Sequence, residues 1–343
     1  MDTKKITIIG LQSARNFADR VGKLLGVKPV YVDSVDFLDT ESKASPLLES
    51  VRGKDVFVCS SLDLKIGAAQ CFMTQLFTIA NISSSFAASI RCFSPYFLYC
   101  RGDQGFDSRS APTAQVVLRA LGSASAQVPI DVTTIELHNP AVQYMGWPIR
   151  FDNFSGSAVF AAYLNAHGLI RPGTVIAPPD KGGVSRAVQL ARLLNVPDFF
   201  SYKVRSADAK VDDIYSFGDV SGKNVVMFDD MIATGETMLK SCEGYYADGA
   251  ESLTVCVVHA ILSGRARESI AAFAQRHPDF RLISTNSINN VVPIGNFHVV
   301  VDLSPLFAES VKVITGNEPL SSYFTDWKAV IELYNGYHTG WEA

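Results

Sequence analysis

The segment Val225-Val-Met-Phe-Asp-Asp-Met-Ile-Ala-Thr-Gly-Glu-Thr237 decides the fold. Its apolar, β-branched start belongs to a strand predicted over Lys223–Phe228, and this strand ends in two adjacent carboxylates, Asp229 and Asp230. A short turn then leads into a helix predicted over about Glu236–Asp248. A buried strand that passes through a short turn into a helix is the repeating unit of parallel α/β sheets.

The same unit recurs along the whole chain. Further strands are predicted over Lys5–Ile9, Asp55–Cys59, Ser89–Phe93, Asp131–Leu137, Thr174–Ala177, Leu253–Ala260 and Val299–Asp302. Further helices are predicted over Ala14–Leu25, Ala68–Ala80, Val116–Leu121, Ser155–His167, Gly183–Leu194 and Arg265–Ala274, the last with Ser263 as its cap. The pattern restarts near residue 150, which indicates two α/β halves, each a mainly parallel sheet flanked by helices.

Length and composition agree with this division. The 343 residues are enough for two domains, which we expect over 1–150 and 151–305, followed by a helix and tail over 306–343 that pack back on the N-terminal domain. A net charge of -4 argues against a nucleic-acid partner. The sequence has no signal-peptide pattern and no run near the roughly 20 apolar residues that span a bilayer, so we expect a cytoplasmic protein with no membrane partner. The six cysteines form no Cys-x-x-Cys pair and are expected to be reduced core residues.

The residues after the predicted strand at 223–228 suit a sugar phosphate. Carboxylates at a strand end, such as Asp229 and Asp230, accept hydrogen bonds from ribose hydroxyls. Loop amides, the hydroxyls of Thr234 and Thr237 and a helix N-terminus hold phosphate. Open α/β sheets place ligands at this carboxyl edge. The alternative is a structural Asp-rich turn with a threonine cap.

The order strand, Asp-Asp, three residues, Thr-Gly-x-Thr resembles the phosphoribosyl pyrophosphate (PRPP) loop of type I phosphoribosyltransferases and of PRPP synthetases, also called ribose-phosphate pyrophosphokinases. Other blocks resemble the second group and follow its order along roughly residues 8 to 325. They are Phe37–Glu41, Val51–Phe57, Pro95–Asp103, Ser108-Arg109, Leu137-His138, Gln143–Asn153, Pro179–Arg186 and Lys203-Val-Arg205. The resemblance implies two type I phosphoribosyltransferase-like domains.

The resemblance also implies a role for each matching residue. Phe37 would stack on adenine across a subunit interface, with Asp39 and Glu41 on the same loop, and Arg101, Asp103 and His138 would contact ATP. His138 and Asp180 would lie at the Mg2+-triphosphate site. Asp229 and Asp230 would hold the ribose hydroxyls, and Ala233, Thr234, Gly235, Glu236 and Thr237 would surround the 5-phosphate. Lys203 and Arg205 would be catalytic and close over the transferred group. Taken singly, each residue also has a purely structural interpretation. His138 would be a structural histidine, Phe37 a core residue, and Lys203 and Arg205 solvated surface charges.

The reaction that the resemblance implies is the transfer of the β,γ-pyrophosphate of ATP to the anomeric hydroxyl of ribose 5-phosphate, which gives PRPP and AMP. Such a transfer needs positioning and charge neutralisation, which Mg2+ supplies with few protein ligands. Family members assemble as homo-oligomers, dimers or hexamers. Two other interpretations are a non-catalytic regulatory homologue and a phosphoribosyltransferase. Neither is favoured, because the first predicts loss of the catalytic residues and the second leaves the N-terminal blocks unexplained.

Several positions depart from the family pattern, among them the segment Ser60–Lys65, which lacks the family's usual Asn-Asp pair. Ala233 replaces an Asp, Glu236 replaces a Gly, and Gly102 replaces a Gln. Glu236 matters most, because one unit-charge repulsion at ~4 Å and an effective dielectric of about 20 costs on the order of 4 kcal/mol. Either Glu236 faces solvent at the helix N-terminus, where its charge suits the dipole, or the acceptor is a substituted ribose phosphate such as ADP-ribose, as in NAD salvage. Gly102 is expected to enlarge or loosen a nucleotide pocket.

Overall fold

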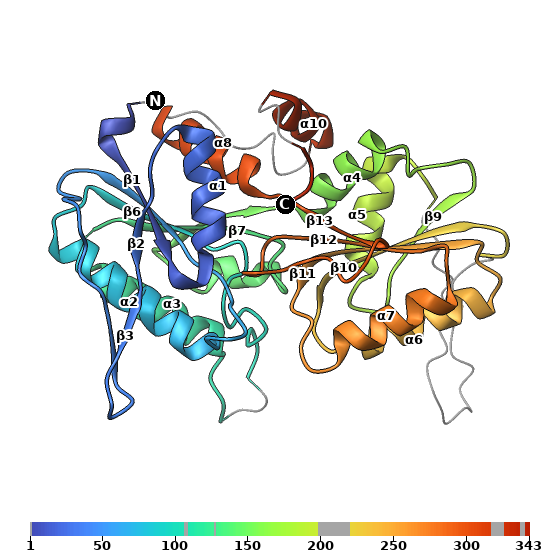
Figure 1. Cartoon of the computed structure of the whole chain (residues 1–343), viewed down its shortest axis with the longest axis horizontal. Coiled ribbons are helices and arrows are strands. Elements are labelled where there is room, and N and C mark those ends of the chain that lie inside the picture. The colour runs from blue at the N-terminus through green and yellow to red at the C-terminus, as the bar shows by residue number, and fades with distance from the viewer. Residues whose placement is uncertain (1, 106–108, 127, 198–219, 317–325, 337–339) are drawn as a thin grey trace.

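Each half of the chain builds one wholly parallel sheet (Figure 1). The computed structural model describes residues 2–105, 109–126, 128–197, 220–316, 326–336 and 340–343. The first sheet has the order β2-β1-β5-β6-β7-β8, with β1 Ile6–Leu11, β2 Val30–Val32, β5 Asp55–Cys59, β6 Ser89–Phe93, β7 Ile130–Ile135 and β8 Arg150–Phe154. The second has the order β13-β12-β11-β10-β9, with β9 Thr174–Ala177, β10 Asn224–Ile232, β11 Ser252–Ala260, β12 Phe280–Thr285 and β13 His298–Val301.

Helices cover both faces of each sheet (Figure 1). They are α1 Arg15–Leu25, α2 Ala68–Ser84, α3 Thr113–Ser125, α4 Gly156–Ala166, α5 Val184–Leu194, α6 Glu236–Ala247, α7 Ala266–Arg276, α8 Ser304–Gly316 and α10 Trp327–Gly336. Short 3-10 turns lie at Thr3–Lys5, Gln12–Ala14 and Pro140–Tyr144. Helices α2 and α3 pack together on one face of the first sheet and α1 and α8 on the other. The pairs α4/α5 and α6/α7 do the same for the second sheet. The predicted fold class is therefore confirmed.

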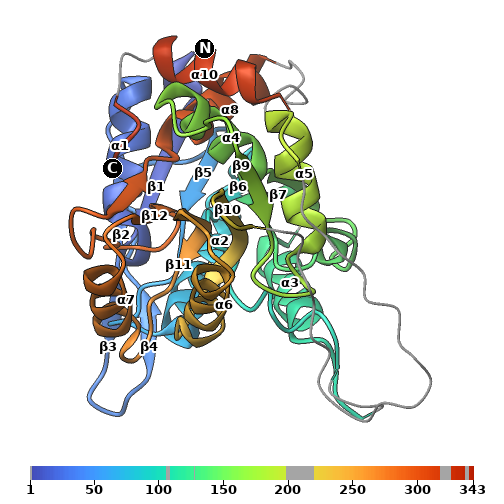
Figure 2. The ribbon, with the colours of Figure 1, turned by 90° about the vertical axis from the view of Figure 1, so that its right-hand side faces the viewer.

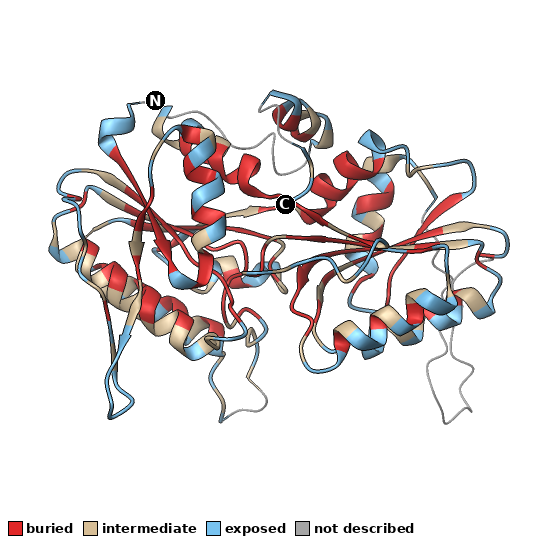
Figure 3. Ribbon diagram, viewed as in Figure 1, coloured by how far each residue is buried: buried red, intermediate tan, exposed pale blue. Residues whose placement is uncertain are grey.

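The two sheets share one apolar core, which Figure 3 shows as buried strands running through the middle of the molecule. Phe307 of α8 packs edge-on against Phe17, Phe93 and Phe154, with ring centroids 5.1 to 5.7 Å apart. Phe160 and Phe228 continue this core into the second sheet. Because α8 contacts α1 and α10 contacts α4, the end of the chain covers both halves.

The strand β10 is longer than predicted. The expected end at Phe228 is wrong, because β10 pairs with β11 as far as Ile232. On its other side, β10 pairs with β9 only as far as Met227, opposite Ala177. Asp229 and Asp230 therefore extend past the end of β9, and an open space remains there for a ligand.

Several short elements were not predicted. They are β2, β8, β12 and the antiparallel hairpin of β3 Ser34–Asp36 and β4 Ser42–Ala44. The expected Ser263 cap is also wrong, because the N-cap of α7 is Arg265, without a side-chain hydrogen bond. The β3–β4 hairpin projects from the body (Figures 1 and 2).

All six cysteines are buried and unpaired, as predicted. Within the described part of the chain, no helix combines the length and the apolar character needed to cross a membrane.

Candidate functional site

A cavity opens where β10 passes the end of β9. Its volume is about 300 Å3. It is lined by Arg101, His138, Asp180, Gly182, Arg186, Asp229, Asp230, Met231, Ile232, Ala233, Thr234, Gly235, Glu236, Thr237 and Met238. The fold thus brings together all seven residues predicted at the ribose-phosphate loop with Arg101 from the β6–α3 connection and His138 from the segment after β7.

Asp229 and Asp230 differ sharply in environment. Asp230 is 3% exposed, and its Oδ2 lies 2.7 Å from His138 Nδ1. Burial alone would raise the pKa of Asp230, but the bond to His138 and the charge of Arg186 outweigh burial and lower it. Burial, and then the charge of Asp230, raise the pKa of Asp229 to about 8. The pair therefore carries one negative charge, mainly on Asp230, and the protonated form of Asp229 is favoured.

The turn after β10 is built for close approach of a ligand. Gly235 has φ +81°, a left-handed conformation that favours glycine, and it precedes the first residue of α6. Backbone bonds from Leu262 to Ile232 and from Ser263 to Ala233 fasten the turn to the end of β11. Thr234, Glu236 and Thr237 are exposed. The first amides of α6 have no partner within the helix, so this turn is suited to an anion.

Asp180 and its glycines form the opposite wall. Asp180 Oδ1 accepts from the amides of Gly182 at 2.8 Å and Gly183 at 3.2 Å. A side chain cannot be added at Gly183, since its Cβ would lie 2.8 Å from Pro179 Cδ. This loop thus holds the carboxylate of Asp180 beside the cavity.

The Arg101–Asp103 segment lies next to His138. Asp103 accepts a hydrogen bond of 2.7 Å from Asn139 Nδ2, the neighbour of His138. At Gly102, a Cβ would lie 2.7 Å from Cβ of Thr113. Thr113 therefore occupies the space that a side chain would need, and the expectation that Gly102 enlarges a nucleotide pocket has no support in this packing.

The predicted adenine loop is not at the cavity. Phe37 lies directly after β3, with 47% of its surface exposed and Lys43 Nζ 5.4 Å from its ring centroid. Asp39 and Glu41 lie in the turn of the same hairpin, where Asp39 Oδ1 accepts from the amide of Glu41. None of the three lines the cavity. The alternative interpretation of Phe37 as a core residue is wrong, because its side chain is exposed. Lys203 and Arg205 lie outside the described residues.

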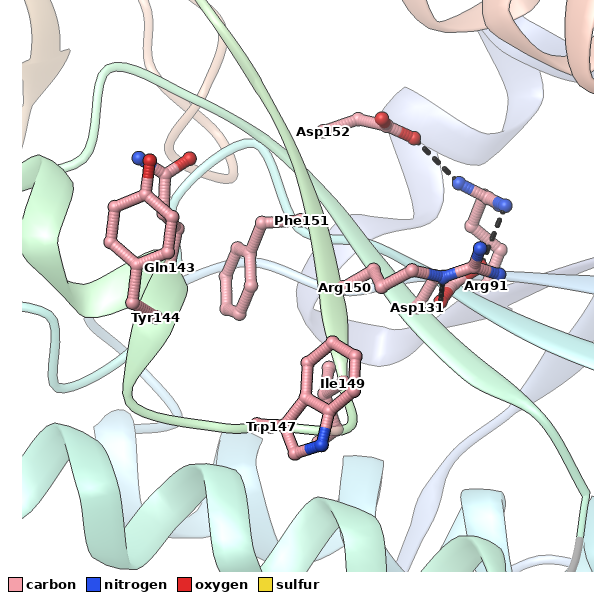
Figure 4. Close-up of a pocket in the computed structure, with 9 residues that line it drawn as sticks. All are labelled: Arg91, Asp131, Gln143, Tyr144, Trp147, Ile149, Arg150, Phe151 and Asp152. Atoms are coloured by element: carbon pink, nitrogen blue, oxygen red, sulfur yellow. Dashed lines mark hydrogen bonds and ion pairs between the residues drawn. The ribbon is translucent and has the colours of Figure 1, made fainter.

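A second hollow, of about 460 Å3, lies beside β8 (Figure 4). It is lined by Arg91, Asp131, Gln143, Tyr144, Trp147, Ile149, Arg150, Phe151 and Asp152. None of the predicted site residues is among them.

The sequence reasoning missed Arg186 and Glu136. Arg186 lines the cavity, with Nη1 3.6 Å from Asp230 Oδ1 and 4.0 Å from Asp229 Oδ1. Glu136 forms an ion pair of 3.0 Å with Arg186. The available signal was position: Arg186 ends the block Pro179–Arg186, and Glu136 directly precedes Leu137-His138.

Comparison with known proteins gives a consistent result for both halves. Residues 6–124 match the model of the N-terminal domain of ribose phosphate pyrophosphokinase, and residues 160–294 match a phosphoribosyl transferase domain. The chain is 33% identical to a ribose-phosphate pyrophosphokinase of Campylobacter jejuni, over 90% of this chain and 95% of the relative. It is 29% identical to ribose-phosphate pyrophosphokinase 2 of Enterococcus faecalis, over 93% and 96%.

The structure agrees with these sequence matches. It superposes on phosphoribosylpyrophosphate synthetase from Mycobacterium smegmatis with a TM-score of 0.79 and 26% identity, covering 91% of this chain and 99% of that one. Because both domain models match in order and the relatives are covered almost from end to end, the chain belongs to the ribose-phosphate pyrophosphokinase family of transferases.

Proposed function

We propose that the chain transfers the β,γ-pyrophosphate of ATP to the anomeric hydroxyl of ribose 5-phosphate. The observation that carries this proposal is the Asp229-Asp230 pair beside the open turn of α6, in one cavity with Arg101, His138 and Asp180. The carboxylates would accept hydrogen bonds from the ribose hydroxyls, and the amides of Thr234–Thr237 would hold the 5-phosphate. The family membership of both halves supports the same reaction.

In this reaction the anomeric oxygen forms a bond to the β-phosphorus. The bond from that phosphorus to the oxygen of the α-phosphate breaks, AMP leaves, and the hydroxyl loses its proton. Holding the two substrates in line accounts for much of the rate that such a site can supply. Arg101 would neutralise phosphate charge on the ATP side, and the catalytic roles of Lys203 and Arg205 remain predictions.

The residues present fit a magnesium ion. The Nδ1 of His138 is engaged by Asp230, which fixes the ring and leaves Nε2 for a ligand, and Asp180 contributes a carboxylate whose Oδ1 is held by amides. Among the described residues no group of three or more His, Cys, Asp or Glu could hold a metal. Mg2+ is bound through few protein ligands, with substrate phosphates and water completing its shell. When bound, it would neutralise charge on the triphosphate.

ADP-ribose is a second candidate acceptor, and Glu236 is the observation that favours it. Glu236 is exposed and lines the cavity next to the proposed phosphate turn. A diphosphate ester carries less charge on the phosphate nearest the ribose than a terminal 5-phosphate does, so it would be repelled less.

The test is AMP formation by the purified chain with ATP and Mg2+, with ribose 5-phosphate and ADP-ribose supplied in separate reactions. AMP and a 1-diphosphate product with ribose 5-phosphate support the leading proposal, and the same result with ADP-ribose alone supports the second. If AMP forms with neither ribose 5-phosphate nor ADP-ribose, both proposals are refuted and a regulatory homologue is favoured. Pyrophosphate release from PRPP and a nucleobase would instead identify a phosphoribosyltransferase.

We also propose that the protein works as a homo-oligomer, a dimer or hexamer. Phe37 is exposed and is not among the residues that line the cavity of its own chain, which supports an adenine contact across an interface. If so, a mixture of Phe37→Ala and Asp230→Asn chains should recover activity that neither variant has alone. No recovery in co-assembled oligomers would contradict the contact.

A further inference from the structure

Arg186 has a separate partner for each side of its guanidinium group. Nε donates to Glu136 Oε1 at 3.0 Å, Nη1 faces Asp230 Oδ1 at 3.6 Å, and Nη2 donates to the carbonyl oxygen of His138 at 2.7 Å. Only 12% of the side chain is exposed. A planar guanidinium offers donors in these fixed, divergent directions, whereas a lysine ammonium is a single point on a flexible stem.

Glu136, which follows β7 of the first sheet, is in turn bonded to two elements of the second half. Its Oε2 accepts from the amide of Gly156, the first residue of α4, at 2.9 Å. Its carbonyl oxygen accepts from Nε2 of His259 on β11, at 3.1 Å. The residue has φ +49°, a left-handed conformation that costs a non-glycine residue about 1–3 kcal/mol and persists only where neighbours enforce it.

These contacts join two strand ends that carry the candidate site. His138 follows β7 of the first sheet, and Asp230 lies on β10 of the second. Arg186 touches both, from α5, and Glu136 anchors it. Although Arg186 lines the cavity, Nε and Nη2 are hydrogen-bonded to protein oxygens and Nη1 is paired with Asp230, so we expect it to influence a substrate through Asp230 and His138.

We propose that Arg186, anchored by Glu136, is a positioning residue that sets the separation of Asp230 and His138 across the two sheets. This inference rests on the function proposed above, in which Asp230 holds the acceptor and His138 lies at the metal-triphosphate group. Displacing a binding group by about 1 Å, or removing the partner that orients it, typically costs about 10- to 100-fold in activity.

The test compares Arg186→Lys with Arg91→Lys in the full chain, with AMP formation from ATP, Mg2+ and ribose 5-phosphate as the assay. Arg91 is a matched control: 17% of its side chain is exposed, and it bonds to Asp131 at 2.8 Å and Asp152 at 2.6 Å, outside the cavity (Figure 4). Both substitutions keep the positive charge and remove the planar guanidinium group with its divergent donors. Thermal unfolding of each variant measures any general loss of stability.

For Arg186→Lys we expect kcat/KM for ribose 5-phosphate to fall about 10- to 100-fold. We expect the KM for ribose 5-phosphate to rise about tenfold, and the KM for ATP to rise as well, because Arg186 also holds His138 at the metal-triphosphate group. A smaller folded fraction lowers kcat and leaves both KM values unchanged, so a rise in KM separates positioning from folding. Arg91→Lys should keep both wild-type KM values within about twofold, because neither Arg91 nor its partners Asp131 and Asp152 line the cavity, and any loss of stability would lower kcat alone.

A second measurement tests whether Glu136 and Arg186 act together on activity. If Glu136 acts through Arg186, then Glu136→Gln combined with Arg186→Lys should lose much less than the product of the two single losses. Multiplicative losses, or an unchanged acceptor KM in Arg186→Lys, would overturn the positioning role while wild-type activity still upholds the proposed function. Absence of activity in the wild type and in Arg91→Lys alike would instead remove the proposed function itself.

Discussion

Substituting Gly156 by alanine tests the packing that surrounds the site. Gly156 begins α4 and donates to Glu136. A Cβ added at this position would lie 2.5 Å from Cγ2 of Val258, 3.1 Å from Glu136 Oε2 and 3.3 Å from Cζ of Phe228. Two of these neighbours are fully buried core residues, so they cannot move aside without disturbing the sheet behind them.

The magnitude follows from these contacts. Overpacking of a tight core by one methyl group costs about 1–3 kcal/mol. Displacement of Glu136 weakens one hydrogen bond, worth about 1 kcal/mol. Alanine regains up to about 1 kcal/mol of helix propensity over glycine. We therefore expect Gly156→Ala to lower the free energy of unfolding by about 1–3 kcal/mol, and to reduce activity as well because Glu136 anchors Arg186.

The assay is urea unfolding of the full chain followed by circular dichroism, with Gly244→Ala as the control. Gly244 lies inside α6, and an added Cβ meets nothing within 4 Å. Alanine there should raise stability by about 0.5–1 kcal/mol. If Gly156→Ala unfolds at or above the wild-type urea midpoint, the close approach of Gly156 to Val258 does not limit the packing, and the reasoning fails.

Two further predictions follow from charge. Replacing Glu236 by Gln should lower the KM for ribose 5-phosphate about fivefold, because one unit-charge repulsion at roughly 4 Å in water is about 1 kcal/mol; the KM for ADP-ribose should change less, and equal changes for both acceptors would contradict the proposed role of Glu236. Burial lowers the pKa of His298 to about 4, and its Nε2 lies 2.8 Å from the hydroxyl of Ser284. As pH falls from about 6.5 to about 4, the unfolded chain binds a proton at His298 that the folded chain refuses, so stability is lost over this window. The stability advantage of the wild type over His298→Gln should shrink accordingly in urea titrations at pH 7, 5.5 and 4.5, and a constant difference would contradict a buried neutral imidazole.

The sequence by itself determined those features that depend on residues close together along the chain. The period of the apolar residues predicted the long strands and helices, because burial on one face repeats every two or 3.6 residues. The Asp229-Asp230 pair and the turn Thr234–Thr237 were identified because a strand, two carboxylates and a phosphate turn are contiguous in the chain. The structure places these residues in one cavity with His138 and Asp180, as expected from the carboxyl edges of parallel strands.

Only the tertiary structure decided which distant residues meet. Arg186 and Glu136 lie 50 positions apart, and their contact depends on how α5 packs against the end of β7. The extra length of β10 depends on its pairing with β11 as far as Ile232, and the lack of room for a side chain at Gly102 depends on Thr113 across the loop. Phe37 is exposed because the β3–β4 hairpin projects from the rest of the protein, and the amino-acid composition of the hairpin does not reveal this. Such features follow from distances in space, since the energy of a close contact or a buried charge depends on three-dimensional separation and not on separation along the chain.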